Sequence, residues 1–420
     1  MTQKKMYLYV GIVLLLLLCS CGLHPYDRDL ADRQYQFAAE MLDAYFIFRD
    51  RLPEDLYRFS SPEALYESVN ERFTFYENHE DAKWRYGFLT TEGYGVGISL
   101  DSVGRGYLIK DVFPGSPGDS AGLEPLDTII AVNGISVKGM TVDEFLSFVR
   151  GENGTDVLLR IRRGADYKNI TVTRGPYRAP SVYVETIDST IALITLTSFF
   201  QETTLPGGSA EEFSAALDKT TAASATIIDL RHNGGGLVEQ CRAIVGELVP
   251  NDTPIVRTKI RTIDEEGKSV EVDSTFLAAG TARAADRTMY ILVDSLTASA
   301  SEILVACLMQ RPKVTVVGGR TYGKGRGQVF AWGPDSVYAQ VTCMTISPAG
   351  SDAVEYDSVG IDPDVEADVS KALDVALGLI DSTGLAKRLL GAGYRGAILS
   401  DVPVYCTEPT ALFTIGRHHD

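Results

Sequence analysis

The stretch with the clearest potential for chemistry is VDSLTASASE at residues 293–302, where hydroxyl side chains crowd between a predicted buried strand and a predicted helix. A serine at a helix N-terminus can serve as a nucleophile, because the positive end of the helix dipole and the free backbone N–H groups can stabilise an oxyanion. Ser and Thr are also the preferred helix caps, a role that involves no catalysis. This stretch alone leaves both roles open for Ser299.

A lysine follows in the glycine-rich stretch GGRTYGKG, residues 318–325. Its pattern, G-x-x-x-x-G-K, is close to the phosphate loop of nucleotide hydrolases. That loop needs Ser or Thr after the lysine to bind Mg²⁺, and a helix that faces the phosphates. Here Gly325 follows Lys324, and the next residues alternate as in a strand. The pattern argues against nucleotide binding, so Lys324 is either an exposed loop lysine or a group with another function.

A catalytic serine needs a base. The chain has five histidines, His24, His79, His232, His418 and His419. Only His232 lies near loops of interest, and a triad would also need an oriented carboxylate. A lysine that is desolvated in a tight apolar site can lose its proton and act as the base. Lys324 follows a predicted buried strand, a place that allows such a site, so the lysine is the simpler candidate for the base.

The region LTASASEILVACLMQRPKVTVVGGRTYGKGRGQVF resembles the C-terminal processing (tail-specific) peptidases, which use a Ser/Lys dyad. The resemblance implies that Ser299 is the nucleophile, Lys324 the general base and Gln328 the residue that holds the lysine. The stretch IIDLRHNGGG is similar to the oxyanion loop of that family. This similarity implies an oxyanion hole made by the backbone N–H groups of Gly235 and Ala300.

Two positions depart from the family pattern: Thr297 replaces a serine, and Gly234 stands where proline is common. The first change leaves the dyad intact, and the second predicts a looser oxyanion loop. The stretch VGIDPDVEAD also matches, so the resemblance covers about residues 93–370. It implies a crotonase/ClpP-like α/β protease core that uses neither a metal nor another cofactor.

The stretch GSPGDSAGLEPLDTIIAVNG resembles a PDZ domain, although Leu126 stands where a turn glycine is usual. PDZ domains add a peptide strand to a sheet edge and hold its terminal carboxylate on backbone amides. The resemblance implies that Gly95, Val96, Gly97 and Ile98 bind the substrate tail, and that Arg150 helps to align the active site. The alternative is a generic small β-rich domain.

Elements that could position these residues follow from hydrophobic periodicity. Residues 30–84 show a helical pattern, with Ser61 as an N-cap before Pro62. Short apolar runs at 225–231, 288–294 and 313–319 alternate with amphipathic helices, which predicts a mostly parallel α/β sheet. The predicted domains are a signal peptide (1–20), a tether with a helical region (21–92), a PDZ domain (93–175), the peptidase core (176–370) and a tail (371–420) that begins with a helix.

The first 21 residues read as an export signal, with two lysines, an apolar run and small residues before Cys21. The stretch LCSC resembles a bacterial lipoprotein cleavage box, which implies a lipid on Cys21. The alternative is an uncleaved N-terminal anchor. We therefore expect a lipid-anchored protein of the bacterial cell envelope that faces the periplasm or the cell surface.

The net charge of −17 argues against nucleic acid as a partner, because phosphate binding needs a basic face. The four cysteines beyond Cys21 are scattered, and no spacing suggests a metal site. Together these features predict an exported serine endopeptidase that binds the C-terminal tails of proteins through its PDZ domain. The alternative is a catalytically inactive PDZ scaffold that only binds tails.

Overall fold

The computed structural model describes residues 28–78, 92–103, 106–188, 190–349, 355–380 and 410–413. The chain divides into two compact units. One unit takes in residues 1–86, 224–376 and 408–420, and the other takes in residues 87–223 and 377–407. We call them the core unit and the PDZ unit.

The PDZ unit is built around a small, mainly antiparallel β-structure. Its elements are β2 (Glu92–Gly95), β3 (Ile98–Val103), β4 (Gly106–Val112), α4 (Pro117–Ser120), β5 (Thr128–Val132), β6 (Ile135–Ser136), α5 (Val142–Val149), β7 (Asp156–Arg163), β8 (Asp166–Thr173), β9 (Gly175–Arg178), β10 (Val182–Asp188), β11 (Ile191–Leu196) and α6 (Gly208–Lys219). Strands β3, β4, β5, β7 and β8 form one sheet in that order, and their apolar side chains pack with α5 around the buried Phe145.

Local sequence signals explain the turns of this unit. Thr141 caps α5, and Glu144 reaches back to the Thr141 backbone N–H in a capping box. Asn133 and Gly134 both have positive φ and form the predicted tight turn between β5 and β6. Leu126 adopts a φ of 72°, so it takes the left-handed conformation that glycine would supply in the family pattern.

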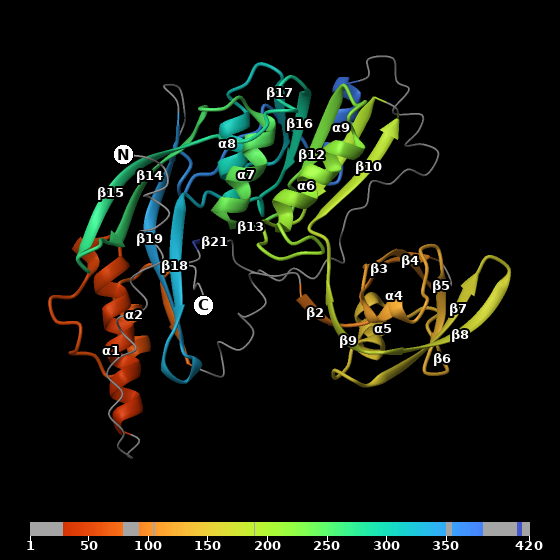
Figure 1. The fold of residues 1–420 in the computed structure, drawn as a ribbon, viewed down its shortest axis with the longest axis horizontal. Coiled ribbons are helices and arrows are strands. Elements are labelled where there is room, and N and C mark those ends of the chain that lie inside the picture. Colours follow the sequence, from red (N-terminus) through yellow and green to blue (C-terminus); the bar gives the residue numbers. More distant parts are fainter. Residues whose placement is uncertain are drawn as a thin grey trace. The chain divides into compact units, whose positions relative to one another are not determined.

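The core unit contains a parallel sheet of the strands β12 (Ala225–Asp229), β16 (Thr288–Val293), β17 (Val314–Gly318) and β20 (Val365–Glu366). The first three strands correspond to the predicted apolar runs. All nine residues of α8 (Ala300–Leu308) are buried, and this helix packs beside α7 (Val238–Leu248), as Figure 1 shows. The helix at the start of the predicted tail is α9 (Ala372–Ile380).

A second sheet of the core unit runs in the order β13 (Gly235–Leu237), β21 (Thr410–Phe413), β18 (Arg326–Trp332), β19 (Tyr338–Pro348), β14 (Pro254–Ile263) and β15 (Ser269–Leu277). Strands β18, β19, β14 and β15 pair antiparallel. The predicted parallel strands β12, β16 and β17 all lie in the first sheet, and this second sheet adds antiparallel strands to the core unit.

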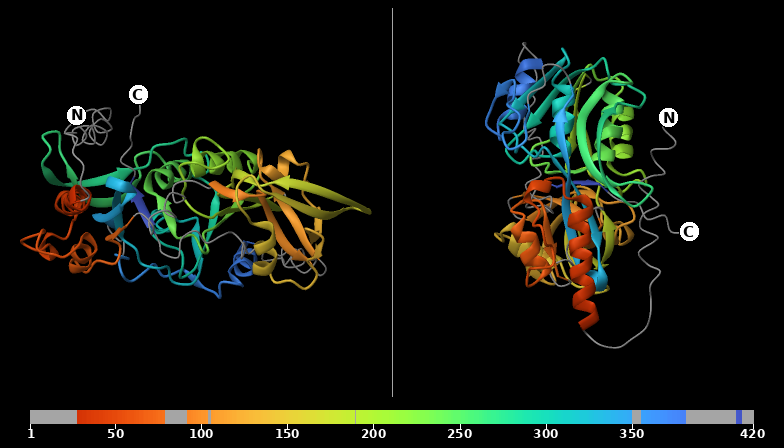
Figure 2. Two further views of the ribbon diagram at one scale, coloured as in Figure 1. Left: turned by 90° about the horizontal axis from the view of Figure 1, so that it is seen from below. Right: turned by 90° about the vertical axis from the view of Figure 1, so that its left-hand side faces the viewer.

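The N-terminal region of the core unit starts with α1 (Arg28–Tyr45), η3 (Arg49–Arg51) and α2 (Pro62–Ser68), and α1 packs on β14, β15 and β19 (Figure 2). Ser61 caps α2 as predicted. The helical expectation for residues 30–84 fails at β1 (Phe75–Glu77), which pairs antiparallel with β19. The reason is tertiary, because β1 gains its hydrogen bonds from a strand far away in the sequence.

Candidate active site

Ser299 lies between β16 and α8, where the sequence placed it. It is fully buried and has φ 60° and ψ −117°, a conformation that costs a non-glycine residue about 1–3 kcal/mol. Its Oγ makes no hydrogen bond to any of the described residues. A strained backbone and an unsatisfied buried hydroxyl are both unfavourable for a structural cap and typical of functional sites.

The carboxylate of Glu302 connects the two candidate catalytic residues. Its Oε2 accepts hydrogen bonds from the backbone N–H groups of Ser299 and Lys324, both at 2.8 Å. Its Oε1 accepts from the Gly323 N–H at 2.7 Å and from the Thr321 hydroxyl at 2.5 Å. Burial raises the pKa of the Glu302 carboxyl, and these four hydrogen bonds oppose the rise. Glu302 therefore fixes the backbone at Ser299 against the backbone at Lys324.

Lys324 is fully buried on the loop between β17 and β18, so it is not an exposed loop lysine. Its Nζ lies 4.3 Å from the centroid of the Phe73 ring. Gly323 has φ 86°, and a Cβ there would lie 2.7 Å from the Gly360 backbone nitrogen. The glycines of this loop thus allow close packing of backbone on backbone, and a strand follows them where a phosphate loop would need a helix.

Gln328 is fully buried in β18. Its Nε2 donates to Thr342 Oγ1 at 3.4 Å, and its Oε1 accepts no hydrogen bond from the described residues. The structure therefore places Gln328 on the strand that follows Lys324 but shows no hydrogen bond from the lysine to this amide oxygen. The predicted role of Gln328 in holding Lys324 stays a prediction.

The predicted oxyanion loop lies directly against Ser299. Gly235 has φ 104°, and a Cβ on it would lie 2.8 Å from Ser299 Cβ and 3.0 Å from the Ala300 backbone nitrogen. Only glycine permits this approach. The Gly235 N–H donates to Asn233 Oδ1 at 2.9 Å. Gly235 is thus close enough to act with Ala300, but its N–H is turned toward Asn233 in this structure.

Asn233 holds the oxyanion loop in place. It is fully buried, and its carbonyl oxygen accepts hydrogen bonds from the Ala298 N–H and from the Ser301 hydroxyl, both at 3.0 Å. These two residues lie on either side of Ser299. Asn233 therefore ties the oxyanion loop to the residues around Ser299. In the same way, Glu302 ties Ser299 to the loop between β17 and β18 that carries Lys324, which we call the lysine loop.

The structure pairs His232 with a carboxylate, which a triad would require. His232 Nδ1 lies 2.8 Å from Asp294 Oδ2, and the His232 N–H also donates to Asp294. The imidazole is 42% exposed, however, and Ser299 Oγ has no hydrogen bond to it. The pair ties the ends of β12 and β16 together without engaging the nucleophile.

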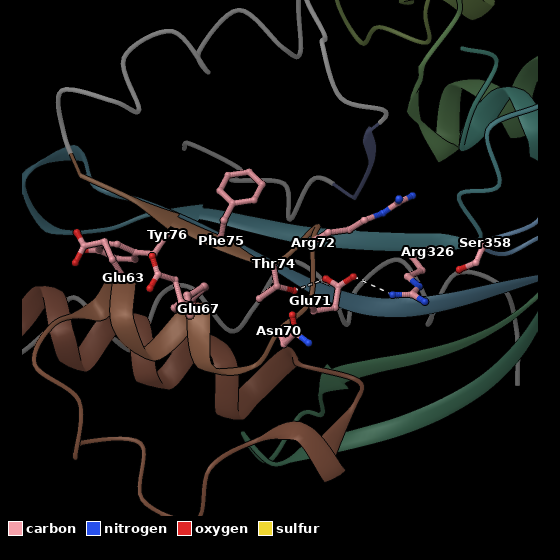
Figure 3. Close-up of a pocket in the computed structure, with 11 residues that line it drawn as sticks. Glu63, Glu67, Asn70, Glu71, Arg72, Thr74, Phe75, Tyr76, Arg326 and Ser358 are labelled. Carbon is pink, nitrogen blue, oxygen red and sulfur yellow. Dashed lines mark hydrogen bonds and ion pairs between the residues drawn. The ribbon is translucent and has the colours of Figure 1, made fainter. Parts of the chain in front are cut away.

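A pocket of about 640 Å³ is lined mainly by side chains from residues 63–76, together with Arg326 of β18 and Ser358 (Figure 3). Among these residues, the buried Glu71 forms an ion pair with Arg326 at 3.0 Å and accepts hydrogen bonds from the hydroxyls of Thr74 and Thr342. Thr342 is the residue that Gln328 contacts. Residues of the N-terminal region thus support the strand that carries Gln328.

In the PDZ unit, Gly95 ends β2, Val96 and Gly97 connect the strands, and Ile98 begins β3. The Val96 carbonyl accepts from the Gly118 N–H at 2.7 Å, and the Gly97 carbonyl accepts from the Phe113 N–H at 3.0 Å. These bonds fix the backbone of the predicted peptide-binding segment. Arg150 is exposed at the end of α5, and its proposed role in alignment stays a prediction.

Several site residues were not singled out from the sequence, namely Phe73, Glu71, Asn233, Glu302 and Thr321. Glu302 carried a signal, because it is the one charged residue in the otherwise apolar helix ASEILVACL. A lone acid in such a helix must find several donors when it is buried. Phe73 and Glu71 carried no such signal, since their partners lie more than 250 residues away.

Cys21 and the export signal fall outside the described residues. Within the described part of the chain, no helix is long and apolar enough to cross a membrane, and no three His, Cys, Asp or Glu side chains are grouped as metal ligands. Cys241, Cys307 and Cys343 are buried free thiols.

Comparisons with known proteins define the class. Residues 190–367 match the model of peptidase family S41, and residues 108–163 match that of the PDZ domain. The crystal structure of a Bacteroides fragilis NCTC 9343 protein described as an S41 protease superposes with a TM-score of 0.54 at 16% identity, and the match covers 86% of this chain and 98% of that one. The chain therefore has the S41 peptidase fold with a PDZ domain, as the sequence predicted.

Among curated proteins, the carboxy-terminal processing protease CtpA of Bacillus subtilis (strain 168) is 30% identical over 308 residues, which are 73% of this chain and 62% of that protein. A probable CtpA-like serine protease of Staphylococcus haemolyticus (strain JCSC1435) is 27% identical over 72% of this chain and 58% of its own. The resemblance to the C-terminal processing peptidases is thereby confirmed. The chain spans about three fifths of the length of these relatives.

Proposed function

We propose that this protein is an exported serine endopeptidase that captures the C-terminal tails of proteins with its PDZ domain and cleaves them with Ser299 and Lys324. The observation that carries the proposal is the shared carboxylate of Glu302, which binds the backbone N–H groups of both residues. Ser299 and Lys324 lie on different loops, and this shared carboxylate holds the two loops at a fixed position relative to each other. Its family relationship to proteases supports the same conclusion.

In the proposed mechanism, Ser299 Oγ attacks the scissile carbonyl carbon while Lys324 Nζ takes the hydroxyl proton. Full burial of Lys324 disfavours its charged form, which prepares the amine to accept that proton. The carbonyl oxygen becomes an oxyanion that the N–H groups of Gly235 and Ala300 bind, so the Gly235 N–H exchanges Asn233 Oδ1 for the substrate. Lys324 then protonates the leaving amine, and water releases the acyl group from Ser299.

The test compares cleavage of a peptide that ends in a free apolar C-terminus with cleavage of its amidated form. We expect the free form to be cleaved more efficiently, with the difference in KM, because the PDZ backbone amides bind the carboxylate. Ser299→Ala and Lys324→Ala should each abolish cleavage, and Lys313→Ala, an exposed lysine of the same unit, is the matched control. Equal cleavage of both peptides would exclude tail recognition, and an active Ser299→Ala variant would exclude the nucleophile.

The proposed location in the cell envelope rests on the sequence of the first 21 residues. If Cys21 carries the lipid, Cys21→Ala should move the protein from the membrane fraction to the soluble fraction of the envelope. An unchanged distribution would support the uncleaved anchor instead. Tail binding without any cleavage by the wild-type chain would support the inactive scaffold.

A further inference from the structure

The strand β21 occupies a place between the two sides of the candidate active site. Its backbone pairs in parallel with β13 on one side, with Thr410 opposite Gly235 and Leu412 opposite Leu237. On the other side it pairs in parallel with β18, with Leu412 opposite Gln328. Figure 1 shows β21 between these two strands.

The opening that β21 fills is one strand wide. In the order of the sheet, β13 and β18 are joined only through β21. Neighbouring strands lie about 4.8 Å apart, so β13 and β18 are separated by about 9–10 Å. A single extended backbone satisfies the N–H and C=O groups that face this opening from both sides, whereas a helix or a side chain would not.

The two sides of the opening carry the proposed catalytic groups. Strand β13 starts at Gly235, where an added Cβ would lie 2.8 Å from Ser299 Cβ and 3.0 Å from the Ala300 nitrogen. Strand β18 starts at Arg326, two residues after Lys324. Because Thr410 lies opposite Gly235, the strand β21 starts level with the nucleophile. A peptide in this position would bring a backbone carbonyl to the serine.

We propose that the opening between β13 and β18 is the site where a peptide substrate binds as a parallel strand, and that residues 410–413 occupy it as an internal competitor. The effect on cleavage rests on the function proposed above, in which Ser299 is the nucleophile. It adds the mode of substrate binding and a means of regulation, because a substrate must displace β21 before it reaches Ser299. The occupant is defined by its chemistry as an uncharged extended segment, Thr-Ala-Leu-Phe.

The size of the effect follows from population arithmetic. If β21 occupies the opening in about 90% of molecules, only about one tenth are competent to bind substrate, and the apparent KM is raised about tenfold. The maximal rate is unchanged, because a saturating substrate displaces the segment. Because the segment belongs to the same chain, its binding is intramolecular, so even a weak interaction suffices.

The experiment uses the full chain with Ala411→Pro or Leu412→Pro, each of which removes one backbone donor from β21. Hydrogen exchange measured by mass spectrometry should show at least tenfold faster exchange in residues 235–237 and 328–329, which pair with β21, with β12 and β16 unchanged. The matched control is Ser400→Pro, at a position outside the described residues and ten residues before β21. A synthetic peptide, Glu-Pro-Thr-Ala-Leu-Phe-Thr-Ile, added to either variant should restore the slow exchange.

A peptidase assay supplies the second measurement, in which both proline variants should lower KM about tenfold at constant kcat. Unchanged exchange in residues 235–237 and 328–329 would overturn the proposal, because β21 would not cover these parts of β13 and β18. Faster exchange together with an unchanged KM would overturn its competitive part. Hydrogen exchange needs no turnover, so faster exchange in a chain that cleaves nothing would refute the proposed function while confirming the occupancy.

Discussion

Replacing Glu302 with glutamine should separate the two candidate catalytic residues without changing either of them. The amide has nearly the shape of the carboxylate, but one of its two ends becomes a donor. Placed at the Oε2 position, the NH₂ group would face the Ser299 and Lys324 N–H groups. Placed at the Oε1 position, it would face the Gly323 N–H and the Thr321 hydroxyl, and only the hydroxyl can turn to accept. The second arrangement costs less.

The magnitude follows from this count of donors. At least one buried backbone N–H loses its partner, at a cost of about 1–3 kcal/mol, and the remaining hydrogen bonds lose the assistance of the charge. Part of this loss is offset because the neutral amide has a smaller desolvation cost than the carboxylate. We expect Glu302→Gln to lower the free energy of unfolding by about 2–4 kcal/mol.

Urea unfolding followed by circular dichroism measures this loss, and steady-state kinetics measure the effect on the site. Because Glu302 binds the backbone at Ser299 and Lys324, its loss should displace the two proposed catalytic groups, so kcat should fall at least tenfold while KM stays the same. Glu239→Gln is the matched control, since Glu239 lies on the neighbouring helix α7 with its side chain 57% exposed, and it should change stability by less than about 0.5 kcal/mol. If Glu302→Gln unfolds like the control and keeps its kcat, Glu302 does not hold the two loops together.

Three further changes test other parts of the core unit. Gly235→Ala should destabilise by about 2 kcal/mol or more in urea, because its Cβ would lie 2.8 Å from a backbone oxygen at φ 104°; Gly319→Ala, where the new Cβ meets nothing closer than 4.0 Å, should cost much less. Glu71→Gln should lower the free energy of unfolding by about 2–4 kcal/mol, because Arg326 loses its buried partner. A loss below about 1 kcal/mol would show that the second partner of Arg326, Asp357 at 3.0 Å, is sufficient. Burial raises the pKa of Cys343 to about 12, against about 8.5 for an unfolded thiol. The folded state therefore favours the neutral thiol, a stabilisation that is complete below pH 8.5 and is lost as the pH rises toward 12. The stability difference between wild type and Cys343→Ala should shrink by about 1 kcal/mol per pH unit between pH 9 and 11, and a constant difference would contradict the burial argument.

The parts of the fold that were predicted correctly depend on neighbours in the sequence. Ser61 before Pro62, Thr141 before a helix, and the Asn133–Gly134 turn are local signals, because each satisfies or bends the backbone within a few residues. The apolar runs of β12, β16 and β17 were also readable, because strands buried on both faces are continuously apolar. Ser299 and Lys324 stood out because motif and position agreed.

The features that were missed depend on pairing across the chain. Strand β1 takes its partner from β19, and Phe73 meets Lys324 only after the N-terminal region has packed on the second sheet. Strand β21 carries an ordinary uncharged sequence, and nothing in Thr-Ala-Leu-Phe specifies β13 and β18 as its neighbours. Such contacts are decided by which surfaces meet, so they need a three-dimensional structure.

The two buried polar anchors, Asn233 and Glu302, have a consequence for how the site opens. Asn233 joins the oxyanion loop to the residues around Ser299, and Glu302 joins Ser299 to the lysine loop. Because each anchor forms hydrogen bonds with two loops, one loop cannot leave its position without breaking the hydrogen bonds that hold the neighbouring loop. The three loops should therefore exchange their amide hydrogens as one cooperative unit with a single opening free energy. Heat or denaturant would then displace Ser299, Lys324 and Gly235 together, so no partly assembled site accumulates.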